Sequence, residues 1–577
     1  MLKLVLGTSG SGKTTLLYAR IRARAEAGKR SILLVPEQFT SSTEARIYRE
    51  LGDALSGMVE SYSFTSLAEH ILAIEGGAAV QTLTDAGRAV LVRRALEELQ
   101  DNVHYYYRHR RSAAFCQMAA ETIDELKSAG LSGQQLQELA RDCGTESAKL
   151  GELALIFQGY ESLLAGTGMD PADRLELAAD RLEAALARDE LPDFLREREV
   201  FIDEFDTFNA PKKRLMGAML AALPAVTVAL CEDGAPMQPG DLELFSGAKQ
   251  VAAQLRQLAR KNGAQVAAPE LLRRDLRHKE APGLAALTEL LETGSCTPPE
   301  SAPELRLFAA ASREEEARCA AAAIRRLMRQ GVRCGKIAVV CRDISLYRAA
   351  VRYEFRMAEI PLYCDEPTTP EFSAPATAVR ALLALLRGAD MTEQLTVLAK
   401  TGLCDLTEPE VCALENYAYI WSPNAAAWRA EFTKSPRGFG DAELTEEDTQ
   451  NLTRAENARK KLVTAVDTLR SKVRSANAEQ ISRALYFCLK ELGAEGQQAA
   501  QVEDIRTARG IPAAEEAARE WNVVMQLLDE MARLLGSQGI TVPEYEDLFS
   551  LLLRSSDLGH IPQTLDAVVL ASAGKMR

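Results

Sequence analysis

A short run of glycine and hydroxyl residues near the start of the chain ends in a lysine and a threonine. It reads Gly7, Thr8, Ser9, Gly10, Ser11, Gly12, Lys13 and Thr14. This is the complete pattern G-x-x-x-x-G-K-[ST], in which backbone N–H groups form a nest for phosphate oxygens, the lysine neutralises the β and γ phosphates, and the last hydroxyl binds Mg²⁺. We therefore predict a site for ATP and Mg²⁺, with Thr14 as a metal ligand. The alternative is a glycine-rich turn that binds nothing.

A pair of carboxylates offers the second half of such a site. Asp203 and Glu204 directly follow Val200–Ile202, an apolar run with the composition of a buried strand. An acid at the carboxyl end of a strand can hold Mg²⁺ through water, and a second acid can polarise the water that attacks a phosphate. We predict the first role for Asp203 and the second for Glu204. The alternative is a solvated acidic turn.

Both sets of residues depend on a sheet that brings them to one edge. The first apolar run ends at the phosphate loop, and a helix is expected to follow from Thr14. The positive dipole end of this helix would face the phosphates of the nucleotide. Between about 75 and 195 the sequence shows only helical periodicity. We predict an α/β fold with a parallel sheet that is interrupted by an all-helical insertion. The apolar runs that predict its strands are 2–6, 31–35, 59–64, 200–202 and 226–230.

A second α/β unit is predicted beyond a linker rich in Pro, Ser and Thr at 292–303. From about 385 to 550 the pattern is helical again. The last predicted strand comes close to the end of the sequence without a following helix, so we expect the chain to be a fragment. The expected elements of this unit are strands at 305–308, 337–340 and 567–571 and a helix at 314–330.

Composition limits the class of protein. A chain of 577 residues is long for one apolar core and should form several domains. Its formal net charge of −14 excludes a generic binder of polyanions, so any contact with DNA needs a local basic surface. The 11 scattered cysteines without a Cys-x-x-Cys pair predict reduced thiols in a cytoplasmic protein, without disulfides or a zinc site. Pro224 divides the long uncharged run Leu215–Cys231, so no membrane span is expected.

The order of these pieces resembles that of the superfamily 1 helicases of the UvrD type and, more closely, that of the AddB family, whose members are subunits of AddAB helicase-nucleases. Residues 7–14 are similar to motif I of these proteins, and residues 202–205 to motif II. Residues 33–40 look like motif Ia of AddB proteins, and residues 59–67 resemble the next segment that contacts DNA in the family.

The resemblance implies two RecA-like P-loop units, each with a large helical insertion. Residues 337–342, followed by 359–363, resemble motif IV, so Arg342 falls where the family places an arginine for the γ-phosphate. The implied boundaries are 1–75 and 196–290 for the first unit, 76–195 for its insertion, 304–385 and 555–577 for the second unit, and 386–554 for its insertion.

Two segments depart from the motifs of the family's helicases. Cys231–Gln238 stands where motif III has a Gly-Asp and a glutamine, and Asp206 stands where motif II has a glutamine. A motor needs this link between the γ-phosphate and the DNA, whereas nucleotide binding needs only the loop. The resemblance therefore implies a helicase-like subunit that holds single- and double-stranded DNA ends beside the true motor, an AddA-type helicase-nuclease subunit.

The family also implies a wider function, which is double-strand break processing for homologous recombination with recognition of a hotspot sequence. Its nuclease domain carries an iron–sulfur cluster, which we expect only in a C-terminal region beyond this sequence. Two alternatives stay open. One is an autonomous superfamily 1 DNA-dependent ATPase or translocase that uses Lys13, Asp203, Glu204 and Arg342. The other is a non-catalytic scaffold with a vestigial phosphate loop.

Two groups of cations allow both a structural and a functional interpretation. Residues 104–111 mix tyrosines with histidines and arginines, a composition that suits stacking on bases and contact with phosphates. The alternative is a set of half-buried tyrosines with a solvated basic edge. Arg318 belongs to a row of arginines on the predicted helix 314–330, which indicates a charged face with pairs such as Glu314 with Arg318.

Overall fold

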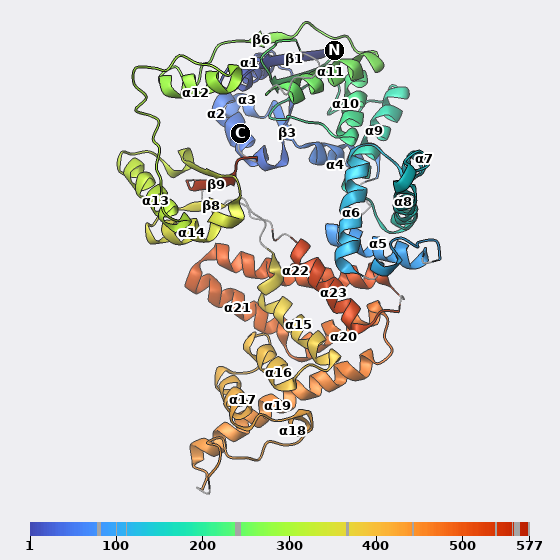
Figure 1. Cartoon of the computed structure of the whole chain (residues 1–577), viewed down its shortest axis with the longest axis vertical. Helices are drawn as coiled ribbons and strands as arrows, with labels where there is room; N and C mark the ends of the chain where they lie inside the picture. Colours follow the sequence, from blue (N-terminus) through green and yellow to red (C-terminus); the bar gives the residue numbers. More distant parts are fainter. Residues whose placement is uncertain are drawn as a thin grey trace.

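Two parallel sheets and a large set of helices make up the chain in its computed structural model (Figure 1). A six-stranded sheet lies at the top of the view, a three-stranded sheet lies below it at the left, and helices α15 to α23 fill the lower half. The structure describes residues 1–77, 82–99, 101–110, 112–236, 244–364, 369–440, 443–536, 539–556, 558 and 566–574.

The six-stranded sheet has the order β3-β2-β4-β5-β1-β6, and every neighbouring pair in it is parallel. Parallel neighbours need crossover connections, which here are helices on the two faces of the sheet. The strands are β1 (Leu2–Gly7), β2 (Ser31–Leu34), β3 (Val59–Tyr62), β4 (Glu199–Ile202), β5 (Ala225–Cys231) and β6 (Glu270–Leu272).

Both faces of this sheet are buried, because alternate residues of each strand enter different apolar clusters. In β1, Val5 packs with α1 and α2 on one face, whereas Leu4 and Leu6 pack with α4, α9, α10 and α11 on the other. The sheet is therefore doubly wound, and such sheets bind ligands outside the carboxyl ends of their strands. The helices around it are α1 (Lys13–Glu26), α2 (Thr40–Leu51), α3 (Asp53–Ser56), α4 (Phe64–Glu75), α9 (Pro171–Ala187), α10 (Ala210–Ala222), α11 (Ser246–Lys261) and α12 (Pro282–Thr293).

The predicted strands of this sheet are confirmed with small shifts, and one strand was missed. The strand expected at 59–64 ends at Tyr62, because the Ser63 hydroxyl accepts a hydrogen bond from the Ser66 N–H and begins α4 there. Strand β6 was not predicted, since three residues are too few to show a period. It forms because β1 offers it an edge, with Val5 opposite Glu270.

Helices from two distant parts of the sequence share one apolar core. Helix α5 packs against α22 and α23, and a single cluster of buried residues runs through both regions. The helices of the first region are α5 (Asp85–Glu98), α6 (Ala113–Ser128), α7 (Gly133–Ala140) and α8 (Ser147–Thr167). Those of the second are α15 (Ala374–Arg387), α16 (Met391–Lys400), α17 (Glu408–Trp421), α18 (Ala425–Arg429), α19 (Glu446–Val473), α20 (Ala478–Glu491), α21 (Ala494–Arg509), α22 (Ile511–Leu535) and α23 (Val542–Ser555).

The three-stranded sheet has the order β7-β9-β8 and is also parallel. The predicted last strand lies in the middle of this sheet, between two strands that come some 200 residues earlier in the chain. Its Val569, for example, pairs with Ala338. Its elements are β7 (Ala338–Cys341), β8 (Leu362–Cys364), β9 (Val568–Ser572), α13 (Arg313–Arg329) and α14 (Ile344–Met357).

Two expectations for this region are wrong. No strand forms at 305–308, where Leu307 is 100% exposed and Phe308 is 66% exposed. The apolar pattern is there, but no described strand pairs with its backbone, and an unpaired strand is not stable in water. The second wrong expectation is the pair of Arg318 with Glu314. Arg318 instead forms an ion pair with Glu354 of α14, at 2.9 Å, because α13 packs against α14 and brings that carboxylate to it.

Candidate nucleotide-binding site

Residues 7–14 form a tight loop between the carboxyl end of β1 and the start of α1. Gly10 and Gly12 have φ angles of +78° and +91°, which a residue with a Cβ rarely adopts. Gly12 is the N-terminal cap of α1, and its carbonyl accepts the Leu16 N–H at 2.9 Å. The loop therefore presents its backbone N–H groups at the positive end of a helix, which is the arrangement that binds phosphate.

The Lys13 side chain folds back over this loop. Its Nζ donates hydrogen bonds to the carbonyls of Gly7 and Thr8, both at 2.8 Å. Burial lowers the pKa of the Lys13 ammonium, and the positive charge of Arg277 also lowers it, while Asp203 acts in the opposite direction. An anion beside Lys13 would stabilise the protonated form, so the electrostatics of the site favour a negatively charged ligand.

Asp203 reaches the loop from β4, the strand beside β5. The Thr14 hydroxyl lies near enough to the Asp203 carboxyl to lower its pKa, and the Glu204 N–H donates a hydrogen bond to Asp203 Oδ1 at 3.0 Å. The carboxylate is buried, and burial raises its pKa although Thr14, Glu204 and Lys13 act in the opposite direction. A divalent cation would favour the ionised form. One hydroxyl and one carboxylate held together are a donor set that fits Mg²⁺.

Glu204 lies beside this pair in an unusual backbone conformation. Its φ angle is +66°, in the left-handed region that costs a non-glycine residue free energy. Its side chain is partly exposed. The pKa of Tyr18 on α1 is raised to about 12, mainly by burial. The nearby charges of Asp203 and Glu204 also raise it, whereas the charge of Arg46 lowers it. Both acids therefore face the α1 side of the sheet edge.

Arg342 is the predicted site residue that the described contacts do not bring to the loop. It follows β7 of the three-stranded sheet and is exposed. No hydrogen bond or ion pair within the described part of the chain joins it to residues 7–14. Its role at the γ-phosphate stays a prediction.

The segment that departs from motif III starts at the same edge as the loop. Cys231, the last residue of β5, pairs in register with Gly7. Asp233 forms an ion pair with Lys249 of α11 at 3.0 Å, which fixes the segment to the outer helix layer. Met237 and Gln238, its last two residues, lie outside the described residues. Asp206, in the motif II position, is exposed.

Sequence reasoning missed the residues that border the loop from the C-terminal side. After β6, the Leu276 N–H donates to the Gly10 carbonyl at 2.9 Å, and Arg277 Nη1 donates to Ser9 Oγ at 3.3 Å. Burial raises the pKa of Glu292, at the end of α12, and the nearby Thr8 side chain acts in the opposite direction. The basic run at 273–279 is visible in the sequence, but only the pairing of β6 with β1 places it on the loop.

The tyrosine and arginine cluster is described in part. Tyr106 packs on Phe115, and the Arg110 guanidinium lies 3.7 Å from the ring centre of Tyr107. The Glu152 carboxylate accepts the backbone N–H groups of 104, 105 and 106. These contacts give the cluster a structural role, and its predicted role in DNA contact is not tested by them. Arg111 lies outside the described residues.

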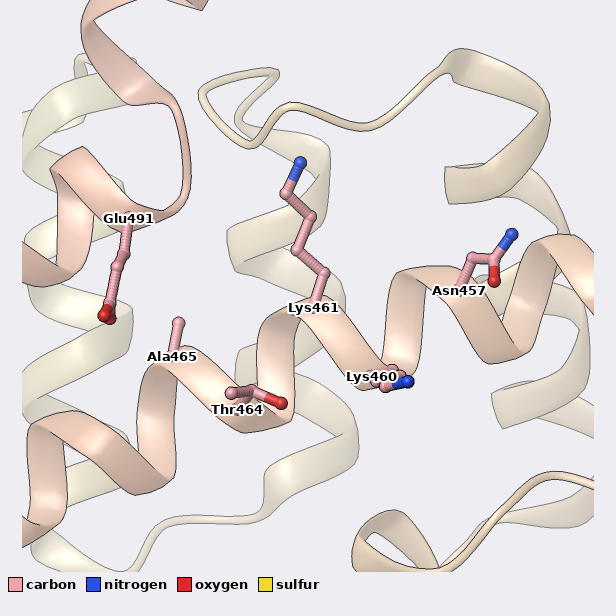
Figure 2. A pocket seen from close by; sticks show the side chains of 6 residues that line it. All are labelled: Asn457, Lys460, Lys461, Thr464, Ala465 and Glu491. Carbon is pink, nitrogen blue, oxygen red and sulfur yellow. The ribbon is translucent and has the colours of Figure 1, made fainter.

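A surface groove of about 380 Å³ lies far from the loop, on α19 (Figure 2). Figure 2 shows Lys460, Lys461 and Thr464 on this helix and Glu491 on the neighbouring α20. Lys461 is already paired with Asp405. The groove has neither a phosphate loop nor a pair of adjacent acids, so it is not a second nucleotide site. Asn457 and Ala465 complete its lining.

Two other features are absent from the described residues. No described helix is both long enough and apolar enough to cross a bilayer. No group of three or more His, Cys, Asp or Glu side chains in the described ranges could hold a metal ion.

Comparisons with known proteins give a matching family model and several curated relatives. Residues 4–288 match the family model "ADDB, N-terminal". Over its full length the chain is 29% identical to an ATP-dependent helicase/deoxyribonuclease subunit of Desulforudis audaxviator and 30% identical to that of Moorella thermoacetica, and it covers 51% of each. It is 24% identical to the protein of the same name from Clostridium acetobutylicum, of which it covers 50%. The chain thus spans about half the length of the curated relatives it matches.

Proposed function

Because this chain belongs to the AddB family, whose members are named as subunits of an ATP-dependent helicase/deoxyribonuclease, we propose that it binds ATP and Mg²⁺ at residues 7–14. In this proposal it holds single- and double-stranded DNA ends beside an AddA-type helicase-nuclease subunit. The complex acts in the cytoplasm on double-strand breaks that enter homologous recombination. Recognition of a hotspot sequence in the DNA belongs to the same proposal.

The contact between Thr14 and Asp203 is the observation that carries the nucleotide site. A phosphate loop alone could be a turn that binds nothing, but here its threonine lies beside a buried carboxylate that follows another strand. Thr14 and Asp203 would hold Mg²⁺, and Lys13 would neutralise the β and γ phosphates. Bound ATP would place its phosphate oxygens in the loop. Its free energy of binding would stabilise the folded edge of the sheet.

The two sheets support the proposal of two RecA-like units. The first unit would be 1–75 and 196–290, with the insertion 76–195. The second would be 304–385 and 555–577, with the insertion 386–554. In superfamily 1 helicases the nucleotide lies between such units, and Arg342 would then act on the γ-phosphate from the second one. Each insertion is helical, and each returns to a parallel sheet.

Two observations favour a holding role over a motor role for the chain. The segment in the motif III position is tied to α11 through Asp233 and Lys249, so its acid is already engaged away from a phosphate. The two helical insertions share one apolar core, which opposes large movements of one against the other. A motor needs both the phosphate link and the movement.

Calorimetric titration of the purified chain with ATP tests the nucleotide site, with Mg²⁺ present. We expect binding that is lost in Lys13→Ala and kept in Lys29→Ala, a control lysine that is exposed. An absence of heat with the wild-type chain would favour the alternative of a scaffold with a vestigial loop. Circular dichroism of each variant shows whether it has folded.

DNA-end binding tests the rest of the proposal. The partner subunit should bind a labelled duplex end more tightly with this chain than without it. This increase in affinity for the duplex end should require the chain but not ATP hydrolysis. The Glu204→Gln variant should therefore produce the same increase. End binding by the partner that is unchanged on addition of the chain would contradict the proposed role.

An autonomous DNA-dependent ATPase is the second candidate, because Glu204 stands next to Asp203 where a water-polarising acid is needed. It predicts ATP hydrolysis by the chain alone that single-stranded DNA stimulates and that Glu204→Gln abolishes. A rate that does not change with DNA would exclude this candidate and leave the holding role.

A further inference from the structure

One side of helix α20 carries aromatic rings and cations that the described chain leaves open to solvent. The exposed residues recur at helical spacing and are Arg483, Tyr486, Phe487 and Lys490. Tyr486 is 42% exposed and Phe487 is 51% exposed. The other side of the helix is buried in the apolar core. We call these four residues, together with Lys472 at the end of α19, the α20 face.

The two rings of the α20 face are neighbours, and a cation lies next to them. The ring centres of Tyr486 and Phe487 are 5.8 Å apart, with their planes inclined at 66°. Lys472 Nζ lies 5.8 Å from the ring centre of Phe487, because α19 packs against α20. The α20 face therefore offers two ring surfaces and a positive charge to the same ligand.

A groove of about 570 Å³ borders the α20 face, between α20 and α22. Tyr486 lines it together with Met525 and Leu528 of α22, so part of its wall is apolar. Arg483 also lines it and is paired with Glu479 at 2.9 Å, with 70% and 41% of the two side chains exposed. An ion pair so exposed is weak. The Arg483 guanidinium can therefore exchange Glu479 for an anionic ligand.

The local charge of this region is opposite to that of the whole chain. Residues 470–490 contain five Lys or Arg and one acid, although the chain has a formal net charge of −14. Lys472 and Lys490 are exposed, and no ion pair with either is found in the part of the chain that the structure describes. A local surplus of free cations on an acidic protein suits a polyanionic ligand.

The residue types show which polyanion fits. Lysine is depleted from the cores of protein interfaces, whereas it is a common contact of nucleic-acid phosphates. The bases of a duplex stack on one another, so their faces are not free to meet Tyr486 and Phe487. In a single strand these faces are free, and successive bases stack on aromatic side chains beside a cationic groove. The α20 face thus combines the two components that single-strand binding requires.

We propose that the α20 face is a binding site for single-stranded DNA. Tyr486 and Phe487 stack on neighbouring bases, and the phosphates are contacted by Lys472, Arg483 and Lys490. The inference rests on the proposed function in that the chain must hold DNA, and it goes beyond it by giving the second helical insertion a site of its own. Figure 1 shows α20 in the lower half of the molecule, well separated from β1 and the phosphate loop.

Fluorescence anisotropy of two labelled strands tests the stacking. One strand is an oligothymidylate, and the other is an abasic strand with the same number of phosphates. The purified wild-type chain should bind the oligothymidylate more tightly. Phe487→Ala and Tyr486→Ala should each weaken its binding about fivefold or more, while they change binding of the abasic strand by less than about twofold.

Matched controls separate this surface from the rest of the chain. Tyr419→Ala removes a ring that is 85% exposed on α17, and it should leave both affinities unchanged. Lys472→Ala should lower the slope of log affinity against log salt concentration by about 0.7, the value for one phosphate contact on a single strand. The exposed Lys29 lies outside the α20 face, so Lys29→Ala should keep the wild-type slope.

A variant that keeps a ring gives a positive test. Phe487→Trp should retain the wild-type affinity for oligothymidylate, because the indole also stacks on bases. Its additional fluorescence, relative to the wild-type chain, should be quenched by oligothymidylate and not by the abasic strand. Fluorescence at this position that does not respond to either strand would contradict the stacking.

The outcomes distinguish this inference from the proposed function. If the wild-type chain binds neither strand, alone or with its partner subunit, the proposed DNA-holding role fails and the inference fails with it. If the wild-type chain binds oligothymidylate and Phe487→Ala binds it equally well, the inference alone fails. Equal weakening for both strands, or weaker association with the partner subunit in place of weaker DNA binding, would also overturn it. Thermal unfolding of each variant verifies that it is folded.

Discussion

The hydroxyl of Thr14 lies beside the carboxylate of Asp203 and acts to lower its pKa, although the two residues belong to widely separated parts of the sequence. The contact exists because β1 and β4 flank β5 in one parallel sheet and end at the same edge. It brings a phosphate loop next to an acid that can hold a metal ion, so the nucleotide and the metal of the proposed function would share one site.

Removal of the Thr14 hydroxyl should abolish the effect of Mg²⁺ on ATP affinity. We expect the wild-type chain to bind ATP more tightly in Mg²⁺ than in a chelator. Thr14→Val should bind ATP equally in both, because the proposed site uses this hydroxyl as a metal ligand. Thr15→Val is the control, since Thr15 is exposed and lies one residue further along α1. Persistent Mg²⁺ dependence in Thr14→Val would refute the assignment. Titration calorimetry measures both.

Asp203→Asn should stabilise the chain at neutral pH while it removes the metal site. Burial raises the pKa of Asp203, so the folded chain holds this proton more tightly than the unfolded chain does. Stability is therefore lost as the pH rises through the raised pKa, and the neutral amide avoids that loss. The midpoint of thermal unfolding at pH 7.5 should be higher for Asp203→Asn, and the difference should shrink as the pH is lowered. A lower midpoint for Asp203→Asn at pH 7.5 would contradict this.

The left-handed backbone at Glu204 gives a stability prediction that does not depend on any ligand. Its φ of +66° costs a residue with a Cβ about 1–2 kcal/mol. Glu204→Gly should therefore be more stable than Glu204→Ala by about 1 kcal/mol, although both lose the same carboxylate. The pair Asp206→Gly and Asp206→Ala serves as control, with glycine the less stable of the two. Equal stability of the two Glu204 variants in urea unfolding would count against strain at this position.

Gly87 is expected to be essential to the joint between the two helical insertions. A Cβ there would lie 2.3 Å from Glu530 Oε1 and 3.0 Å from Leu534 Cδ1. The same buried Glu530 carboxylate accepts the Thr84 hydroxyl at 2.7 and 2.8 Å, so it cannot move away freely. Gly87→Ala should cost about 1–3 kcal/mol of unfolding free energy.

A helical glycine in open space provides the comparison for Gly87. A Cβ at Gly151 of α8 meets no atom within 4 Å, so Gly151→Ala should be neutral or stabilise the chain by up to about 1 kcal/mol. Glu530→Ala should reduce the cost of Gly87→Ala in the double variant. If Gly87→Ala and Gly151→Ala have the same free energy of unfolding in urea, the prediction of tight packing between α5 and α22 is wrong.

Local signals in the sequence predicted the parts of the site that lie within one stretch of chain. The loop pattern, the apolar run before it and the acids after Val200–Ile202 each need only neighbouring residues, because strands buried on both faces are continuously apolar. Contacts between distant segments were not predictable in this way. Arg277 meets Ser9 only because β6 joins the edge of β1.

The errors have the same physical origin. The run at 305–308 is as apolar as a true strand, but strand formation depends on a neighbour that the run itself cannot supply. Arg318 has Glu314 one helical turn away in the sequence, yet it pairs with Glu354 because α14 packs beside α13. In both cases a contact between distant segments, and not the local sequence pattern, determines the structure.

The shared core also affects how the chain is made. Thr84 and Glu530 are 446 residues apart, and a ribosome adds about 5–20 residues per second. The side of α5 that meets α22, which includes Gly87, must therefore wait for tens of seconds before this partner helix leaves the exit tunnel. During that interval it is a binding surface for chaperones. Slowing synthesis between the two halves should lengthen the exposure and lower the yield of native chain without any change in sequence.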